Sequence, residues 1–241
     1  CTRILLDQQY SVTVIDNLST GYLKAVDKRA TFFNIDIKDK DAVKHVLTNQ
    51  HIDVVIHFAA YSLVGESMVK PLKYYDNNVS GTKALLEAMV EADVKSIVFS
   101  STAAVYGDHT KMPITEEFEE RPTNTYGETK LAIEKMMKWV DNAHGVKYVA
   151  LRYFNVAGAH NSGEIGEAHN PETHLIPLIL QVPNGQREFI HIFGEDYDTA
   201  DGSCIRDYIH IEDLIHAHIL AMKYVLETRQ SNYFNLGSGE G

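Results

Sequence analysis

Residues 94–101 read VKSIVFSS, an apolar run that ends in two serines. Four similar runs occur elsewhere in the chain, and helical patterns separate them. Strands that are buried on both faces of a parallel sheet read as nearly continuous apolar runs. Their alternation with helices predicts an α/β fold built on a doubly wound parallel sheet. The other expected strands are 10–16, 31–36, 52–60 and 147–154, and the expected helices are 40–47, 72–92 and 126–142.

The composition of the chain changes after Phe154. Residues 158–172 are polar and rich in glycine, as is typical of a loop. We therefore expect a main domain over residues 1–155 and a smaller lobe over residues 156–241, with segments between about 204 and 236 returning to the main sheet. The patterns in this second part predict helices at 173–181 and 211–226 and strands at 190–193, 204–209 and 234–236.

The start of the chain is unusual for this fold. A dinucleotide-binding sheet normally begins with a strand and a glycine-rich turn, because the pyrophosphate lies on the N-terminus of the first helix. Residues 1–9, CTRILLDQQ, resemble the end of a helix instead. We expect that the first strand and the glycine-rich turn are absent and that the chain is trimmed or incomplete.

Composition excludes several classes of protein. The 241 residues are 44% hydrophobic and 23% charged, as in globular proteins, and suffice for a sizeable core. With 33 acidic and 22 basic residues the net charge is −11, which argues against a nucleic-acid-binding surface. No apolar run approaches the roughly 20 residues of a membrane span. The two cysteines, Cys1 and Cys204, do not suggest a disulfide framework, so we expect a cytoplasmic protein.

Three strand ends carry residues suited to a dinucleotide. An acid at Asp16 would bind ribose hydroxyls and favour NAD over NADP, although a strand-ending aspartate is also a common turn or cap residue. Asp36 and Ile37 could frame an adenine ring, or Asp36 could cap the following helix. Residues 57–60, HFAA, place small side chains where ligands approach an open sheet, or where elements pack closely.

The strongest pattern is YGETK at residues 126–130. Tyr126 and Lys130 share one face of a helix. A free tyrosine has a pKa of about 10, and we expect a nearby ammonium to lower that pKa and favour the phenolate. Ser100, Ser101 and Thr102 stand at the end of a strand before this helix, so a strand-end hydroxyl could bind the same substrate oxygen as Tyr126. Such a tyrosine–lysine pair can also be a simple surface pair, and the context of the strand end favours a catalytic site.

Seven segments together resemble the extended short-chain dehydrogenase/reductase family, and within it the 4-epimerases of UDP-hexoses. The resemblance covers essentially the whole chain. It implies a Rossmann-like fold with a substrate-binding lobe, NAD as cofactor, a UDP-sugar substrate and a homodimer that binds neither nucleic acid nor membrane. The segments are DNL (16–18), HFAA (57–60), YYDNNVSGT (74–82), FSSTAAVYG (99–107), YGETK (126–130), LRYFNVAGA (151–159) and IRDYIHIEDL (205–214).

The implied activity is the interconversion of UDP-glucose and UDP-galactose in galactose metabolism, through a transient 4-keto sugar and bound NADH. The resemblance makes Tyr126 the catalytic base, Lys130 the residue that holds the nicotinamide ribose, and Thr102 the hydroxyl partner. The cofactor contacts that it implies are Asp16, Asn17, Asp36, Ile37, Phe58, Ala59, Ala60, Asn77, Tyr126, Lys130 and Phe154. The implied substrate contacts are Thr102, Tyr126, Asn155, Leu175, His191, Phe193 and Arg206.

Alternative functions remain at this stage. Nucleotide-sugar 4,6-dehydratases resemble this family but carry Asp-Glu where this chain has Ala103 and Ala104, so elimination would lack a proton carrier. An epimerase of UDP-GlcNAc/UDP-GalNAc or of a UDP-uronate is harder to exclude, and a non-catalytic NAD-binding regulator is the rival outside enzymes. The twelve histidines show no standard spacing of metal ligands, so we expect no metal site.

Overall fold

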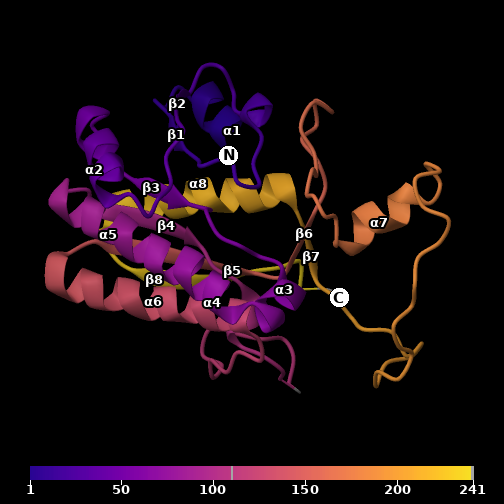
Figure 1. Cartoon of the computed structure of the whole chain (residues 1–241). Helices are drawn as coiled ribbons and strands as arrows, with labels where there is room; N and C mark the ends of the chain where they lie inside the picture. The colour runs from indigo at the N-terminus through magenta and orange to yellow at the C-terminus, as the bar shows by residue number, and fades with distance from the viewer. Residues whose placement is uncertain (110, 240–241) are drawn as a thin grey trace.

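The computed structural model describes residues 1–109 and 111–239. Its central sheet has the strand order β3 (Val55–His57), β4 (Ser96–Ser100), β5 (Lys147–Tyr153) and β8 (Asn232–Leu236) (Figure 1). Every neighbouring pair in this sheet is parallel. The expected α/β fold with a doubly wound parallel sheet is therefore confirmed, with shorter strands than the apolar runs suggested.

Helices cover both faces of the central sheet, which gives three layers (Figure 1). On one face, α2 (Lys40–Asn49), α5 (Gly81–Glu91) and α6 (Thr125–His144) bury a core with Ile97, Phe99 and Ala150 of the sheet. On the other face, α1 (Thr2–Asp7) and α8 (Ile211–Thr228) pack on Val98, Val149 and Leu151. Alternate residues of β4 thus face opposite layers, which explains why all five are buried.

Two further parallel strand pairs lie outside the central sheet. One joins β1 (Thr13–Ile15) to β2 (Thr31–Phe33), and the other joins β6 (Asn155–Ala157) to β7 (Tyr208–His210). Ile15 packs against the core that contains α2 and α5. The β6–β7 pair continues from the end of β5, so it brings the segment around residue 208 to the carboxyl edge of the main sheet.

The expected helix at 72–92 has an irregular first part. Helix α3 (Val64–Val69) precedes α4 (Pro71–Tyr74), and a π-helical stretch, Tyr75–Ser80, joins α4 to α5. Such π-helical insertions are frequent at functional sites. Here the insertion carries Asn77 and the fully buried Asn78. Two single 3-10 turns, Leu23–Ala25 and Ala103–Val105, complete the short elements of this part of the chain.

Two expectations for the second part are wrong. Residues 190–193 form no strand, and of residues 204–209 only the end belongs to one, since β7 begins at Tyr208. Ile192 and Phe193 are 73% and 97% exposed, so this apolar run has no layer to cover it and no neighbouring strand to hold its backbone. The helical expectations hold, because α7 (Leu175–Gln181) and α8 lie where the periodicity placed them. No helix in the described ranges has the length and apolarity needed to cross a membrane.

Candidate functional site

The site is built first from the end of β4. After Ser100 the chain leaves the sheet, and the Thr102 side chain accepts a 3.1 Å hydrogen bond from the backbone N–H of Ala104. This bond caps the 3-10 turn at 103–105 and fixes the Thr102 hydroxyl oxygen. Because the oxygen already accepts from the backbone, its O–H proton remains to be donated elsewhere. Thr102 is 8% exposed, so its hydroxyl is largely shielded from solvent.

Helix α6 brings Tyr126 to Thr102. The Asn124 side chain caps the helix by accepting from the backbone N–H of Gly127 at 2.8 Å. A Cβ atom at Gly127 would lie 2.6 Å from the carbonyl oxygen of Ala104, so only glycine permits this approach. The close contact sets the first turn of α6 against the turn that Thr102 caps. Tyr126 and Thr102 therefore meet, and the Thr102 side chain interacts with the Tyr126 phenol.

The pKa of Tyr126 differs from the sequence-based expectation. Burial raises the pKa of the phenol above its ordinary value, Tyr153 and Tyr74 add to the increase, and the hydrogen bond with Thr102 opposes it. The expectation that Lys130 lowers the pKa of Tyr126 is therefore wrong. The Lys130 ammonium lies 5.8 Å from the centroid of the Tyr126 ring, too far to offset the burial of the phenol.

Lys130 lies one helical turn beyond Tyr126 and is 3% exposed. Its Nζ atom donates a 2.8 Å hydrogen bond to the Ser100 carbonyl oxygen and lies 4.7 Å from the centroid of the Phe99 ring. Burial lowers the pKa of Lys130 to about 7, and the nearby Glu134 opposes that decrease. Among the described residues this is the one hydrogen bond of Nζ, so two N–H donors of a buried ammonium can bind a ligand.

The expected adenosine contacts lie at the ends of β1 and β2. Asp16 is half-buried and accepts a 2.6 Å hydrogen bond from the backbone N–H of Leu18, as a turn residue does. Asn17 donates to the Asp36 carboxylate at 3.1 Å, so these two residues are adjacent. Ile37 is half-buried against Gly81 at the start of α5. Asp16 therefore acts as a turn residue through Oδ1, and its Oδ2 has no hydrogen-bond partner among the described residues.

The remaining expected cofactor residues follow β3 and β5 or lie in the π-helical stretch. Phe58 is 42% exposed, and the centroid of its ring lies 4.8 Å from that of His218 on α8. Ala59 is exposed and Ala60 half-buried directly after it. Asn77 donates to Asn78 at 3.1 Å, and Asn78 in turn donates to Thr129 on α6. Phe154 is half-buried at the end of β5.

The expected substrate residues fall into two groups. Asn155 and Arg206 come close because the backbone N–H of Asn155 donates to the Asp207 carbonyl oxygen at 3.0 Å, at the start of the β6–β7 pair. Leu175, His191 and Phe193 lie in the exposed second part, with Phe193 97% exposed. The structure thus brings the first group to the start of the β6–β7 pair and leaves the second group exposed.

Sequence analysis overlooked several buried polar residues next to this site. His218 on α8 donates from Nδ1 to the Leu214 carbonyl at 2.8 Å, so its Nε2 accepts the Ser100 hydroxyl at 2.7 Å. The Tyr153 phenol also interacts with the Ser100 side chain. Burial lowers the pKa of His218 to about 4, which keeps the ring neutral. The available signal was a histidine on the apolar face of a helix that packs beneath the FSST segment.

A group of metal-ligand types lies in the second part, although we expected none. One ligand atom each from Glu167, His169, Glu172 and His174 falls within 4.8 Å of the others. The group lies in an exposed loop, and each histidine Nδ1 already bonds to the glutamate two residues before it. These internal pairs account for the arrangement, so the absence of a metal site stays a prediction.

Comparison with known proteins gives a consistent result. The model of the NAD dependent epimerase/dehydratase family matches residues 1–237. A UDP-glucose 4-epimerase from Halalkalibacterium halodurans is 56% identical over 237 residues, which are 98% of this chain and 71% of that protein. A UDP-glucose 4-epimerase from Brucella ovis, solved with NAD, superposes with a TM-score of 0.97 at 44% identity and covers all of this chain and 74% of its own.

A third relative was solved with both ligands in place. The UDP-glucose 4-epimerase from Bifidobacterium longum, in complex with NAD+ and UDP, has a TM-score of 0.91 at 37% identity over 99% of this chain and 74% of its own. The family match, the sequence identity and the structural similarity therefore agree. The chain belongs to the NAD dependent epimerase/dehydratase family.

Proposed function

We propose that this protein is an isomerase that interconverts UDP-glucose and UDP-galactose by 4-epimerisation, with NAD as its cofactor. The observation that carries the proposal is the meeting of the Tyr126 phenol, the Thr102 hydroxyl and the Lys130 ammonium at the end of β4. A phenol beside a donor hydroxyl and a cation is suited to move a proton at a sugar hydroxyl. The relatives described above bear the name of this activity.

The described residues fit the two ends of NAD that they would hold. Lys130 has a buried ammonium with two N–H donors to spare, as contact with ribose hydroxyls requires. Asp16 has a carboxylate oxygen free to accept from the other ribose. The remaining proposed contacts are Asn17, Asp36, Ile37, Phe58, Ala59, Ala60, Asn77 and Phe154. A bound NAD would supply the acceptor for a hydride from C4′ and, once reduced, the donor that returns it.

Tyr126 performs the proton transfer in this account. It accepts the proton of the sugar 4′-hydroxyl as C4′ is oxidised and returns a proton when the 4-keto sugar is reduced on its other face. Net oxidation is zero, so the same phenol acts as base and then as acid. Because burial raises the pKa of Tyr126, the phenolate needs nearby stabilisation, which the hydrogen bond from the Thr102 hydroxyl supplies.

The sugar must turn over between the two half-reactions while its nucleotide stays in place. We assign nucleotide binding to Asn155, Arg206, Leu175, His191 and Phe193. Asn155 and Arg206 lie at the sheet edge, and Arg206 is exposed with a guanidinium suited to a diphosphate. In this division residues 1–155 bind NAD, and residues 156–241 mostly bind substrate, although α8 and β8 pack with the main sheet.

The residues after Thr102 argue against dehydration. Ala103 and Ala104 form the 3-10 turn and offer no acid or base for elimination. Discrimination between UDP-glucose and UDP-GlcNAc is a question for experiment, since a structural neighbour from Campylobacter jejuni is named a UDP-Glc/GlcNAc 4-epimerase. The test is turnover of UDP-galactose and of UDP-GalNAc by the full-length protein. Efficient turnover of UDP-galactose supports the proposal, and turnover of UDP-GalNAc alone would replace it.

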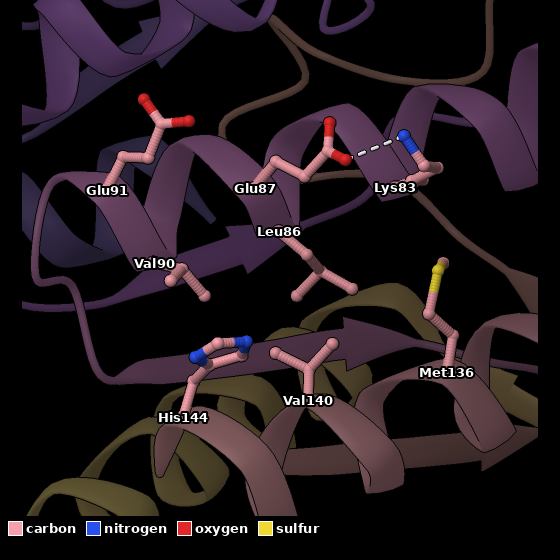
Figure 2. A pocket seen from close by; sticks show the side chains of 8 residues that line it. All are labelled: Lys83, Leu86, Glu87, Val90, Glu91, Met136, Val140 and His144. Atoms are coloured by element: carbon pink, nitrogen blue, oxygen red, sulfur yellow. Dashed lines mark hydrogen bonds and ion pairs between the residues drawn. The ribbon is translucent and has the colours of Figure 1, made fainter.

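We also propose that the protein is a homodimer formed through the groove between α5 and α6. Leu86, Val90, Met136 and Val140 line this groove, which encloses about 260 Å³ (Figure 2). Trp139 on α6 is 71% exposed. Lys83, Glu87, Glu91 and His144 complete its lining, so the groove has an apolar floor with a polar rim, as is typical of a protein interface. It contains none of the proposed catalytic residues.

Sedimentation of two matched variants tests the homodimer. Val140→Glu places a charge in the groove, and Leu220→Glu changes an exposed apolar residue of α8 on the other side of the sheet. The proposal expects a dimeric wild type, a monomeric Val140→Glu variant and a dimeric Leu220→Glu variant. A dimer that survives Val140→Glu would place the interface elsewhere.

A cytoplasmic location is the last part of the proposal. Cys1 and Cys204 are free thiols, 203 positions apart in the chain, and free thiols are typical of reducing compartments. Cell fractionation of the tagged full-length protein tests this location, and recovery from a membrane or secreted fraction would contradict it.

A further inference from the structure

The end of β4 is held from both faces of the sheet. Ser100 directs its hydroxyl to His218 on α8, at 2.7 Å. The next residue, Ser101, donates its hydroxyl to Oε1 of Glu134 on α6. Ser101 also extends the ladder by one step, because its backbone N–H donates to the Leu151 carbonyl at 2.9 Å. Side-chain hydrogen bonds to helices on opposite faces of the sheet therefore hold Ser100 and Ser101, just before the 3-10 turn.

Glu134 lies on the same face of α6 as the proposed catalytic pair. Tyr126, Lys130 and Glu134 follow one another at intervals of four residues, so they form one row along the helix. Glu134 is 1% exposed and carries no role in the proposed proton transfer. Its neighbour Lys130 binds the Ser100 carbonyl, and Glu134 binds the Ser101 hydroxyl. Helix α6 thus forms hydrogen bonds with two consecutive residues at the end of the strand.

The Glu134 carboxylate is itself held by Arg152 of β5. Arg152 Nε donates to Oε1 at 3.1 Å, and Nη2 donates to Oε2. The guanidinium is 1% exposed, and Nη1 donates to the Tyr106 hydroxyl at 2.8 Å. A bidentate pair of this kind fixes the plane of the carboxylate. Arg152 of β5 therefore fixes the position of the carboxylate oxygen that accepts the Ser101 hydroxyl.

We propose that Glu134 is a positioning residue for the 4-epimerisation: through Ser101 it fixes the strand end that presents the Thr102 hydroxyl to the substrate and the Ser100 carbonyl to Lys130. The inference rests on the proposed function. Glu134 touches neither substrate nor cofactor in this role, and its effect reaches the reaction through two backbone positions. A purely stabilising ion pair would leave the reaction rate of the folded protein unchanged.

The first test removes the link and keeps the ion pair. Ser101→Ala deletes the hydroxyl and leaves Glu134 paired with Arg152. The matched control is Ser96→Ala on the same strand, where a fully buried serine binds Arg229 at 3.4 Å far from the site. We expect Ser101→Ala to lower kcat for UDP-galactose at least ~10-fold with little change in KM, because small displacements of reacting groups are costly to the rate. Ser96→Ala should retain the wild-type kcat.

A second variant replaces the pair itself. Glu134→Leu, Arg152→Met and Glu120→Gln are combined, because Arg152 also pairs with the half-buried Glu120, and removal of all three charges avoids an unpaired carboxylate. If this triple variant folds, its kcat should fall at least as far as that of Ser101→Ala. Unfolding curves show which variants are folded at the assay temperature. If the triple variant is unfolded, the kcat of Ser101→Ala alone tests the inference. Wild-type kcat in folded Ser101→Ala overturns the inference, whereas a wild-type enzyme without turnover would overturn the proposed function instead.

Discussion

The Nζ atom of Lys130 donates a 2.8 Å hydrogen bond to the carbonyl oxygen of Ser100. This bond ties helix α6 to the last residue of β4, two positions before Thr102. The three groups of the proposed reaction therefore sit on only two elements, one strand end and one helix. Their relative placement depends on how closely those two elements pack, and the first predictions follow from that dependence.

Thr102→Ser should keep most of the turnover of UDP-galactose, and Thr102→Val should lose it. Only the hydroxyl is used, and its oxygen is already fixed by the backbone of Ala104. Loss of a hydrogen bond that forms in the transition state costs about 10²–10³-fold in kcat at comparable sites. Steady-state kinetics of both variants supply the comparison, and an active Thr102→Val enzyme would reduce the residue to a packing role.

Gly127→Ala should lower both stability and turnover. The added Cβ would lie 2.6 Å from the Ala104 carbonyl oxygen, so α6 must move away from the turn that holds Thr102. Overpacking of this kind costs about 1–3 kcal/mol. Gly65→Ala in α3 is the control, because a Cβ there meets nothing within 4 Å. The free energy of unfolding in urea and kcat are measured for both variants. If Gly127→Ala and Gly65→Ala give the same values, the contact between Gly127 and Ala104 does not position the site.

The free energy of unfolding should fall as the pH drops from 6.5 toward 4.5. Burial lowers the pKa of His57 to about 3 and of His218 to about 4, from an ordinary value of 6.5. In this range the two histidines bind protons in the unfolded chain but stay neutral in the folded chain, so acid favours unfolding. Each histidine contributes a slope of about 1 kcal/mol per pH unit.

Replacement of one histidine tests the origin of that slope. His218→Asn should remove about half of it, and His216→Gln, an exposed neighbour on α8, should leave it unchanged. Urea unfolding at pH 6.5, 5.5 and 4.5 gives the slopes. An unchanged slope in His218→Asn would mean that His218 does not titrate differently in the two states.

Metal chelation should leave the activity intact. The proposed chemistry uses a phenol, a hydroxyl and an ammonium, and the side chains at 167–174 satisfy one another. Turnover of UDP-galactose is compared before and after dialysis against EDTA. A loss that zinc or magnesium restores would show that the protein needs a metal.

Sequence patterns predicted the central layers well for a physical reason. Strands β4 and β5 are buried on both faces, and α6 and α8 each bury one face, so their apolar residues carry a clear period. The Tyr126 and Lys130 pair was visible because four residues separate neighbours on a helix face. The glycine at 127 gave no such signal, since its role depends on the approach of Ala104.

The buried polar contacts were out of reach of sequence patterns. Arg152 is the next-to-last residue of β5, and nothing local shows that it pairs with Glu134 on α6, 18 residues earlier. The same holds for His218 and Ser100, which are 118 residues apart. The apolar run at 190–193 misled because a strand depends on a partner, and the described residues provide none for it.

The most direct measurement of the central claim is the rate at which Tyr126→Phe converts UDP-galactose to UDP-glucose, relative to the wild-type full-length protein. The account predicts wild-type turnover and a loss of at least 10²–10⁴-fold in the variant, the range expected for a missing general acid and base. Binding of UDP should change little, because the phenol is assigned to the sugar. A Tyr126→Phe protein with near-normal turnover, or a wild-type protein that binds NAD and UDP-galactose without converting it, would contradict the account.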